Sequence, residues 1–262
     1  MRICCAAVLL SGCGRLGFDA RVASDAPDAT DAAQPVCPVQ SVPSTITVSG
    51  DTFRYTTFTN MTAPIAGATV QARDRTDLSI LATVTSDGSG AYSLSYSTDG
   101  DVTPLALIYA APTYNETIVI PSVVDRDIMG MTVAVFSVGD GPLWNDGALD
   151  SVYSAYGSGL PRDATLGTIN VAVRDCDGNP LEGASVTFDR TPDDFAYQRP
   201  DGAFDLSLTA TVQPYTHLVA FNMPLDSYRV SAQRPGYRFT DESIFTDASA
   251  TTLVVIRGAL AP

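Results

Sequence analysis

Lysine is absent from this chain of 262 residues, and histidine and tryptophan occur only once each. Without lysine there is no ε-amino group for Schiff-base formation or general-base catalysis. A zinc peptidase needs two histidines and a carboxylate on its metal, which the single His217 cannot supply. No Gly-x-Ser-x-Gly turn accompanies His217 to indicate a serine hydrolase. We therefore expect His217 to be a structural or surface residue, and the protein to be no enzyme.

Positive charge is also scarce. The chain has 15 arginines against 29 acidic residues, which gives a net charge of −14. Nucleic-acid binding depends on clustered Lys and Arg that release counterions from phosphates, so this composition argues against a nucleic-acid partner. Anionic lipid headgroups are disfavoured for the same reason.

A short apolar run, Ile3–Leu10, follows Arg2 and leads into Leu10, Ser11, Gly12 and Cys13. The run is shorter than the about 20 residues that a membrane-spanning helix needs, so it predicts a processing signal over residues 1–12. Leu-Ser-Gly-Cys resembles the lipobox cut by the lipoprotein signal peptidase. That resemblance implies a lipid on Cys13 and a membrane as partner. The alternatives are an ordinary secretory signal that contains cysteine and a misassigned start codon.

Residues 13–43 are dominated by Asp, Ala, Pro, Ser and Thr. Such a segment is too polar and too uniformly charged to bury a core, so we expect a disordered tether that spaces a folded body from a lipid surface. Gly14, rather than Asp, follows the lipidated cysteine. By resemblance to the sorting rule of enterobacterial lipoproteins, this favours the outer membrane.

Only two cysteines remain as thiols once Cys4 and Cys5 leave with the signal and Cys13 is acylated. They are Cys37 and Cys176, and two thiols in an oxidising compartment invite pairing. Nothing in the sequence fixes the distance between them. A disulfide and two separate thiols therefore both remain open.

Apolar residues alternate with polar ones from about residue 45, which is typical of half-buried β-strands. The alternating positions are Ile46/Val48, Val70/Ala72, Tyr92/Leu94/Tyr96, Leu105/Leu107/Tyr109, Ile118/Ile120 and Met131/Val133/Val135. The same order recurs at Ile169/Val171/Val173, Val186/Phe188, Phe204/Leu206/Leu208, Tyr228/Val230/Ala232 and Leu253–Ile256. This spacing predicts an all-β protein of two antiparallel sandwiches, one over 44–137 and one over 166–262.

The segment Pro64-Ile65-Ala66-Gly67-Ala68-Thr69-Val70 aligns with Pro180-Leu181-Glu182-Gly183-Ala184-Ser185-Val186. At these residues, and at Asp175-Cys176-Asp177-Gly178-Asn179 before the second copy, the chain resembles the carboxypeptidase regulatory-like, transthyretin-related family. The resemblance implies an Ig-like sandwich in each repeat. That family is a class of scaffolds, so it implies a fold more than a function.

The linker 138–165 carries the one helix that the sequence predicts. Asn145 is a natural N-cap, Trp144 and Leu149 have the spacing of a hydrophobic staple, and Gly157 can end the helix. Trp144, Tyr153 and Tyr156 could form an aromatic platform for a carbohydrate. The alternative, which we favour, is that they pack the helix against a sandwich.

Carboxylates are plentiful, and two clusters could supply oxygen ligands to Ca²⁺. These are the turn Asp175–Asn179 and the pair Asp125 and Asp127. The turn lacks the distal Glu of a calcium loop, and hairpins need Asp, Gly and Asn in any case. We expect no metal and no cofactor. The expected function is a non-catalytic, lipid-anchored envelope protein for adhesion, carbohydrate binding or assembly, and the alternative is a spacer that docks a protein partner through a sandwich edge.

Overall fold

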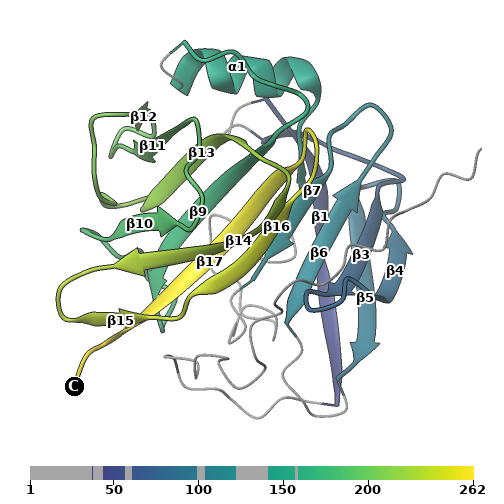
Figure 1. Ribbon diagram of the computed structural model, residues 1–262. Coiled ribbons are helices and arrows are strands. Elements are labelled where there is room, and N and C mark those ends of the chain that lie inside the picture. Colours follow the sequence, from purple (N-terminus) through teal and green to yellow (C-terminus); the bar gives the residue numbers. More distant parts are fainter. Residues whose placement is uncertain (1–36, 38–43, 57–60, 99–103, 122–140, 157–158) are drawn as a thin grey trace, which may run out of the picture. The chain divides into compact units, whose positions relative to one another are not determined.

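Strands make up most of the part of this protein that the structure describes, as the alternating sequence predicts (Figure 1). The computed structural model describes residues 37, 44–56, 61–98, 104–121, 141–156 and 159–262. The described strands before the helix are β1 (Thr45–Tyr55), β2 (Met61–Pro64), β3 (Thr69–Asp74), β4 (Ile80–Thr85), β5 (Ala91–Ser97), β6 (Leu105–Ala110), β7 (Thr117–Ile120) and β8 (Gly141–Leu143). After α1 (Asp146–Tyr156) come β9 (Gly167–Asp175), β10 (Ser185–Phe188), β11 (Asp194–Gln198), β12 (Phe204–Asp205), β13 (His217–Met223), β14 (Asp226–Gln233), β15 (Tyr237–Phe239), β16 (Glu242–Thr246) and β17 (Thr251–Leu260).

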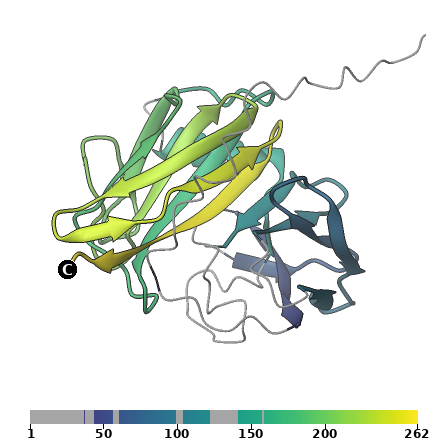
Figure 2. The ribbon, with the colours of Figure 1, turned by 60° about the horizontal axis from the view of Figure 1, so that its bottom comes forward.

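Three sheets hold these strands. A four-stranded sheet has the order β2-β1-β5, with β8 parallel to β1, and a three-stranded sheet has the order β10-β14-β16. The third sheet has ten strands in the order β12-β11-β13-β9-β17-β7-β6-β3-β4, with β15 paired to β17. In Figure 2 the strands of the second repeat, coloured green to yellow, can be followed separately from the blue strands of the first.

The ten-stranded sheet passes from one repeat into the other through β7 and β17. These strands pair in parallel over Thr117–Ile120 and Thr251–Val254, and β17 also pairs in parallel with β9. The prediction of two purely antiparallel sandwiches is wrong on this point, since the sheet is mixed. The predicted division into two domains is likewise not confirmed, because residues Ala33–Pro262 form one compact unit.

Burial explains why the two repeats meet in the middle of the ten-stranded sheet. Every described residue of β7 and β13 is buried, as are all of β9 except Asp175. Strands that are apolar on both faces are the ones that belong in the middle of a large covered sheet. The alternation seen in the sequence at β6, β7 and β9 marked only one of their two buried faces.

The large sheet separates two apolar cores, and each core takes residues from both repeats. One core gathers Val70, Leu107 and Tyr109 of the first repeat with Phe221 and Leu253 of the second. The other core gathers Ala106, Ile118 and Ile120 of the first repeat with Val171, Leu218, Val230 and Ile256 of the second. Neither repeat therefore encloses its core alone.

Two strand predictions have other outcomes. The strand expected over Phe204–Leu208 is wrong beyond Asp205, because the Asp205 carboxylate accepts hydrogen bonds from the Ser207 N–H and hydroxyl and turns the chain. The strand expected at Met131, Val133 and Val135 lies outside the described residues. Within the described part, no helix has the length and apolarity to cross a membrane.

Candidate functional site

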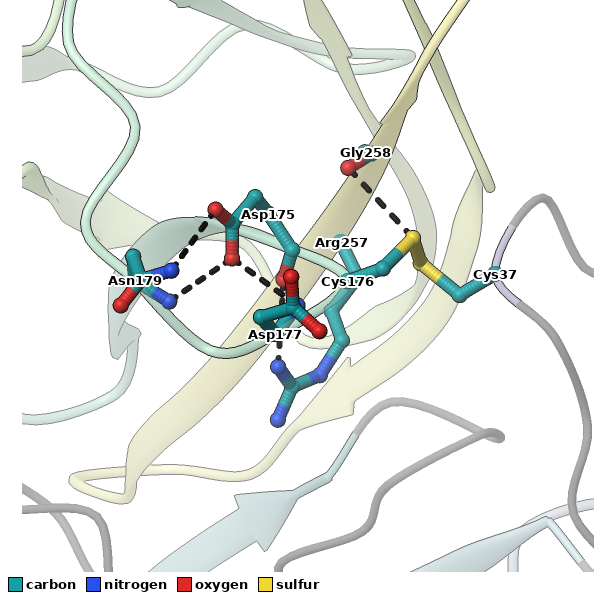
Figure 3. The surroundings of a disulfide bond; sticks show 7 residues. All are labelled: Cys37, Asp175, Cys176, Asp177, Asn179, Arg257 and Gly258. Carbon is teal, nitrogen blue, oxygen red and sulfur yellow. Dashed lines mark hydrogen bonds between the residues drawn. A yellow bond between two sulfur atoms is a disulfide. The ribbon is translucent and has the colours of Figure 1, made fainter.

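A disulfide joins Cys37, the first described residue, to Cys176 in the turn after β9 (Figure 3). The two Cα atoms lie 5.4 Å apart, and Cys37 is only 4% exposed. The Cys176 sulfur also lies 3.6 Å from the carbonyl oxygen of Gly258 in β17. The pairing that the sequence left open is thus present in the structure, and it fastens Cys37, which lies within the predicted tether 13–43, to the turn after β9.

The Asp175 carboxylate closes the turn that carries Cys176. One oxygen accepts hydrogen bonds from the backbone N–H groups of Asp177, at 2.9 Å, and Asn179, at 2.8 Å. The other oxygen accepts one from the Asn179 side-chain amide at 3.0 Å. These bonds are those of an Asx turn, which agrees with a structural role for this segment. Asp125 and Asp127 lie outside the described residues, and among those described no three His, Cys, Asp or Glu side chains are grouped as a metal site would require.

Exposed Asp-x-Ser and Asp-x-Thr sequences repeat this use of carboxylates in turns. The Asp87, Asp163 and Asp205 carboxylates each accept a hydrogen bond from the hydroxyl two residues later, at 2.7, 2.6 and 2.6 Å. These hydroxyl bonds are the main reason why the pKa of each of the three carboxyl groups is lowered. Much of the acidic composition therefore serves to form turns.

His217 is buried at the start of β13, where it pairs with Ala172 of β9. Its Nδ1 lies 3.1 Å from Oδ1 of Asn170, and since an amide oxygen can only accept, the ring Nδ1–H donates this hydrogen bond. Burial, and secondarily the nearby Arg174 guanidinium, lower the pKa of the imidazole to about 3. A neutral imidazole that is 2% exposed cannot exchange protons with a substrate in solution. The geometry therefore supports the structural role that the sequence predicts.

Of the two roles considered for Trp144, Tyr153 and Tyr156, the structure shows the favoured one, packing, for Trp144 and Tyr153. The aromatic platform is wrong for these two residues. Trp144 is 0% exposed and packs against Tyr55 with ring centroids 5.4 Å apart, and Tyr153 is 2% exposed. Neither ring offers a face to a ligand, because both fill the core between the helix and the sheets. The side chain of Tyr156 lies outside the described residues.

The helix itself begins as the sequence predicts. The Asn145 side-chain oxygen accepts a hydrogen bond from the Ala148 N–H at 2.9 Å, which is the bond of an N-cap. Trp144 and Leu149 lie in the same core cluster, as a hydrophobic staple requires. The Tyr153 hydroxyl then bonds Thr168 Oγ1 at 2.8 Å and the Asn222 N–H at 3.1 Å. The predicted end at Gly157 lies outside the described residues.

A groove that the sequence analysis missed lies beside the turn from β14 to β15. It has a volume of about 600 Å³, and its lining includes Ser185, Thr209, Gln233, Arg234, Tyr237 and Phe239. The Arg234 guanidinium carbon lies 4.5 Å from the centroid of the Tyr237 ring. The sequence signal was Arg234-Pro235-Gly236-Tyr237, which on its own suggests no more than a turn.

The residues of the predicted processing signal, Leu10, Ser11, Gly12 and Cys13, lie outside the described residues, so the lipid anchor stays a prediction.

No protein-family model and no curated protein sequence matches the chain. The resemblance to carboxypeptidase regulatory-like domains accordingly stays a prediction.

Several solved structures are similar at low identity. The Bacillus anthracis TIE protein is 10% identical, with 82% of this chain and 34% of that chain covered and a TM-score of 0.23. A minor pilin of Streptococcus agalactiae is 10% identical, with coverages of 78% and 86% and a TM-score of 0.27. The full-length major pilin RrgB of Streptococcus pneumoniae is 11% identical, with coverages of 86% and 49% and a TM-score of 0.23. The chain thus spans about a third of the first protein and about half of the last. Scores this low carry no argument about function, and the assignment to β-sandwiches rests on the strand pairing itself.

Proposed function

We propose that this chain is a non-catalytic envelope protein that a lipid on Cys13 holds to a membrane, where it displays its two β-sandwich repeats as a binding or assembly module. The tether 13–43 spaces the folded body from the lipid surface. Gly14, rather than Asp, follows the lipidated cysteine, and by the sorting rule of enterobacterial lipoproteins this places the protein in the outer membrane.

The disulfide between Cys37 and Cys176 is the observation that carries this proposal. Structural disulfides persist in oxidising compartments and are rare where glutathione and thioredoxin keep thiols reduced. Its position matters too, since Cys37 lies within the C-terminal part of the proposed tether 13–43. A tether that is covalently fixed to lipid at Cys13 and to the folded body at Cys37 suits a protein that must stay attached outside the cell.

The surroundings of the side chains that could take part in catalysis support a binding role instead. His217 is buried and neutral, and the Asp175 carboxylate is engaged in its own turn. The polar side chains of Ser185, Thr209 and Gln233 line the groove beside β15.

Lipid processing is tested in cells that express the full chain. Globomycin, which blocks the lipoprotein signal peptidase, should cause a precursor to accumulate, and mass spectrometry should find an acylated peptide that begins at Cys13. The matched variant Cys13→Ser should abolish the acylated peptide and release the protein from membranes, whereas Cys5→Ser should change neither. Recovery of the chain with Met1 intact, in the soluble fraction and insensitive to globomycin, would contradict the proposal.

A second candidate function is docking of a protein partner through a sheet edge. The strand β4 favours it, because it is the terminal strand of the ten-stranded sheet. Leu78, just before β4, and Ile80, its first residue, are 43% and 56% exposed. An edge strand with apolar neighbours can pair with a strand from another chain. Cross-linking of an envelope preparation should then yield an adduct that Ile80→Arg abolishes. Arg54→Gln should leave the adduct intact, because Arg54 is an exposed residue of β1 at a position where β1 is paired with both β2 and β8.

A further inference from the structure

An arginine, a tyrosine and a phenylalanine form a row along the groove beside β15. The Arg234 guanidinium stacks on the Tyr237 ring, and the rings of Tyr237 and Phe239 follow with centroids 6.3 Å apart and planes inclined by 29°. Tyr237 and Phe239 are two positions apart on one strand and so share a face. Gly258 of β17 makes room for the row, since a Cβ there would lie 2.4 Å from a Phe239 ring carbon.

Stacking holds the Arg234 guanidinium in place without using its hydrogen-bond donors. The ring contacts the flat face of the guanidinium, while its N–H groups point outward in the plane of the group. Among the described residues, Arg234 takes part in no ion pair, whereas Arg75 and Arg162 are held by carboxylates. The structure thus holds the Arg234 guanidinium over the Tyr237 ring and pairs it with no carboxylate among the described residues, and a guanidinium can bind a carboxylate through two parallel hydrogen bonds.

The rest of the lining is polar and suited to hydroxyl groups. Ser185, Thr209 and Gln233 contribute two hydroxyls and an amide, each able to donate and to accept. Gly183, with φ of +75°, borders Arg234, and a Cβ at that position would lie 3.9 Å from its Nε. A volume of about 600 Å³ lies within the range of small-molecule sites.

We propose that this groove binds a carboxylate-bearing saccharide, a uronic acid unit of an anionic glycan. Arg234 binds the carboxylate through two parallel hydrogen bonds, the edge of the aromatic row contacts the apolar C–H face of the sugar ring, and Ser185, Thr209 and Gln233 bond its hydroxyls. The lining favours a sugar because its side-chain hydroxyls and amide can both donate hydrogen bonds to sugar hydroxyls and accept hydrogen bonds from them. The inference rests on the proposed function, since such a glycan is met outside the cell.

Calorimetric titration of the purified full chain with trigalacturonate tests the site. Binding should be measurable for the native protein and at least tenfold weaker for Arg234→Gln. The matched control is Arg238→Gln, which removes the same charge from an exposed position on β15, between Tyr237 and Phe239, and should change the dissociation constant less than twofold. Tyr237→Leu, which removes the stacking surface but keeps the charge, should also weaken binding at least threefold. Unchanged unfolding midpoints would show that the variants remain folded.

Three outcomes would overturn the inference. They are no binding of trigalacturonate to the native protein, equal losses in Arg234→Gln and Arg238→Gln, and equally tight binding of poly-glutamate, which would mark an acidic-peptide site. Neutral trigalactose should bind at least tenfold more weakly than trigalacturonate. A protein that passes the globomycin test but fails this titration would be a lipid-anchored module with a different ligand, so the two proposals fail separately.

Discussion

The guanidinium of Arg75, just after β3, donates a hydrogen bond of 2.9 Å to the carboxylate of Glu242, at the start of β16. The two side chains are 8% and 1% exposed, and 167 positions separate them in the sequence. An ion pair this buried is costly to break, because each charge has given up its hydration. Together with the pairing of β7 and β17, it joins the two repeats away from solvent.

Replacing Glu242 by Gln should leave the buried Arg75 charge without its counter-charge. We expect the free energy of unfolding to fall by about 3–5 kcal/mol, the usual cost of removing one partner of a buried pair. Urea denaturation of the full chain measures this loss. The control is Glu182→Gln, an exposed acid whose replacement should change the free energy by less than about 0.5 kcal/mol. Equal effects of the two variants would contradict a structural role for the ion pair.

The shared sheet and shared cores predict that both repeats unfold in one transition. Trp144 lies between the repeats and is the only tryptophan, so its fluorescence reports the region around the helix. Far-ultraviolet circular dichroism reports all the strands. The two signals should give the same midpoint in urea, as cooperative unfolding requires. Two separate transitions would instead indicate independent domains, as the repeat pattern in the sequence suggested.

The sequence predicted local elements well and their assembly poorly. Alternation located β3, β5, β10 and β14, since each has one face in a core and one in solvent. The N-cap at Asn145 could also be predicted, because it depends on neighbouring residues alone. The parallel pairing of β17 with β7 could not be predicted, because it joins segments about 130 positions apart and leaves no local pattern in the sequence.

For the candidate site, too, the sequence predicts residue types and local patterns but not which distant residues meet. The sequence brought Cys37 and Cys176 into consideration but could not give their separation, which depends on the whole fold between them. It favoured packing over ligand binding for Trp144 but left both open, because aromatic residues on a helix face have the same pattern whether they pack or bind. Arg234 and Tyr237 are ordinary turn and strand residues until the structure stacks one on the other.

Loss of the disulfide should destabilise the folded chain. The bond closes a loop over a sequence separation of 139, and constraining the unfolded chain in this way typically contributes about 2–4 kcal/mol. The double variant Cys37→Ser/Cys176→Ser should lose this amount in urea denaturation. A reducing agent should lower the stability of the native protein toward that of the variant and leave the variant itself unchanged. A native protein insensitive to reduction would mean that the bond contributes nothing to its stability.

His217 should make stability depend on pH below its ordinary pKa. The folded pKa is lowered from 6.5 to about 3 by burial and by Arg174, so between these values the unfolded chain binds a proton that the folded chain does not. Stability contributed by the neutral ring is therefore complete above pH 6.5 and falls as the pH drops. The slope approaches about 1.4 kcal/mol per pH unit.

The pKa of Glu116 is shifted in the opposite direction from that of His217. Burial, and secondarily the negative charge of Asp247, raise the pKa of its carboxyl group above 4.5. Protonation of Glu116 consequently favours the folded state as the pH falls, and it partly offsets the histidine. The informative quantity is the difference between the pH profiles of the native protein and His217→Asn, measured by urea denaturation from pH 7 to 5. The native profile should fall more steeply with acid than that of the variant, whatever stability the substitution itself costs. Parallel profiles would mean that His217 is charged in the folded protein, against the burial that the structure gives it.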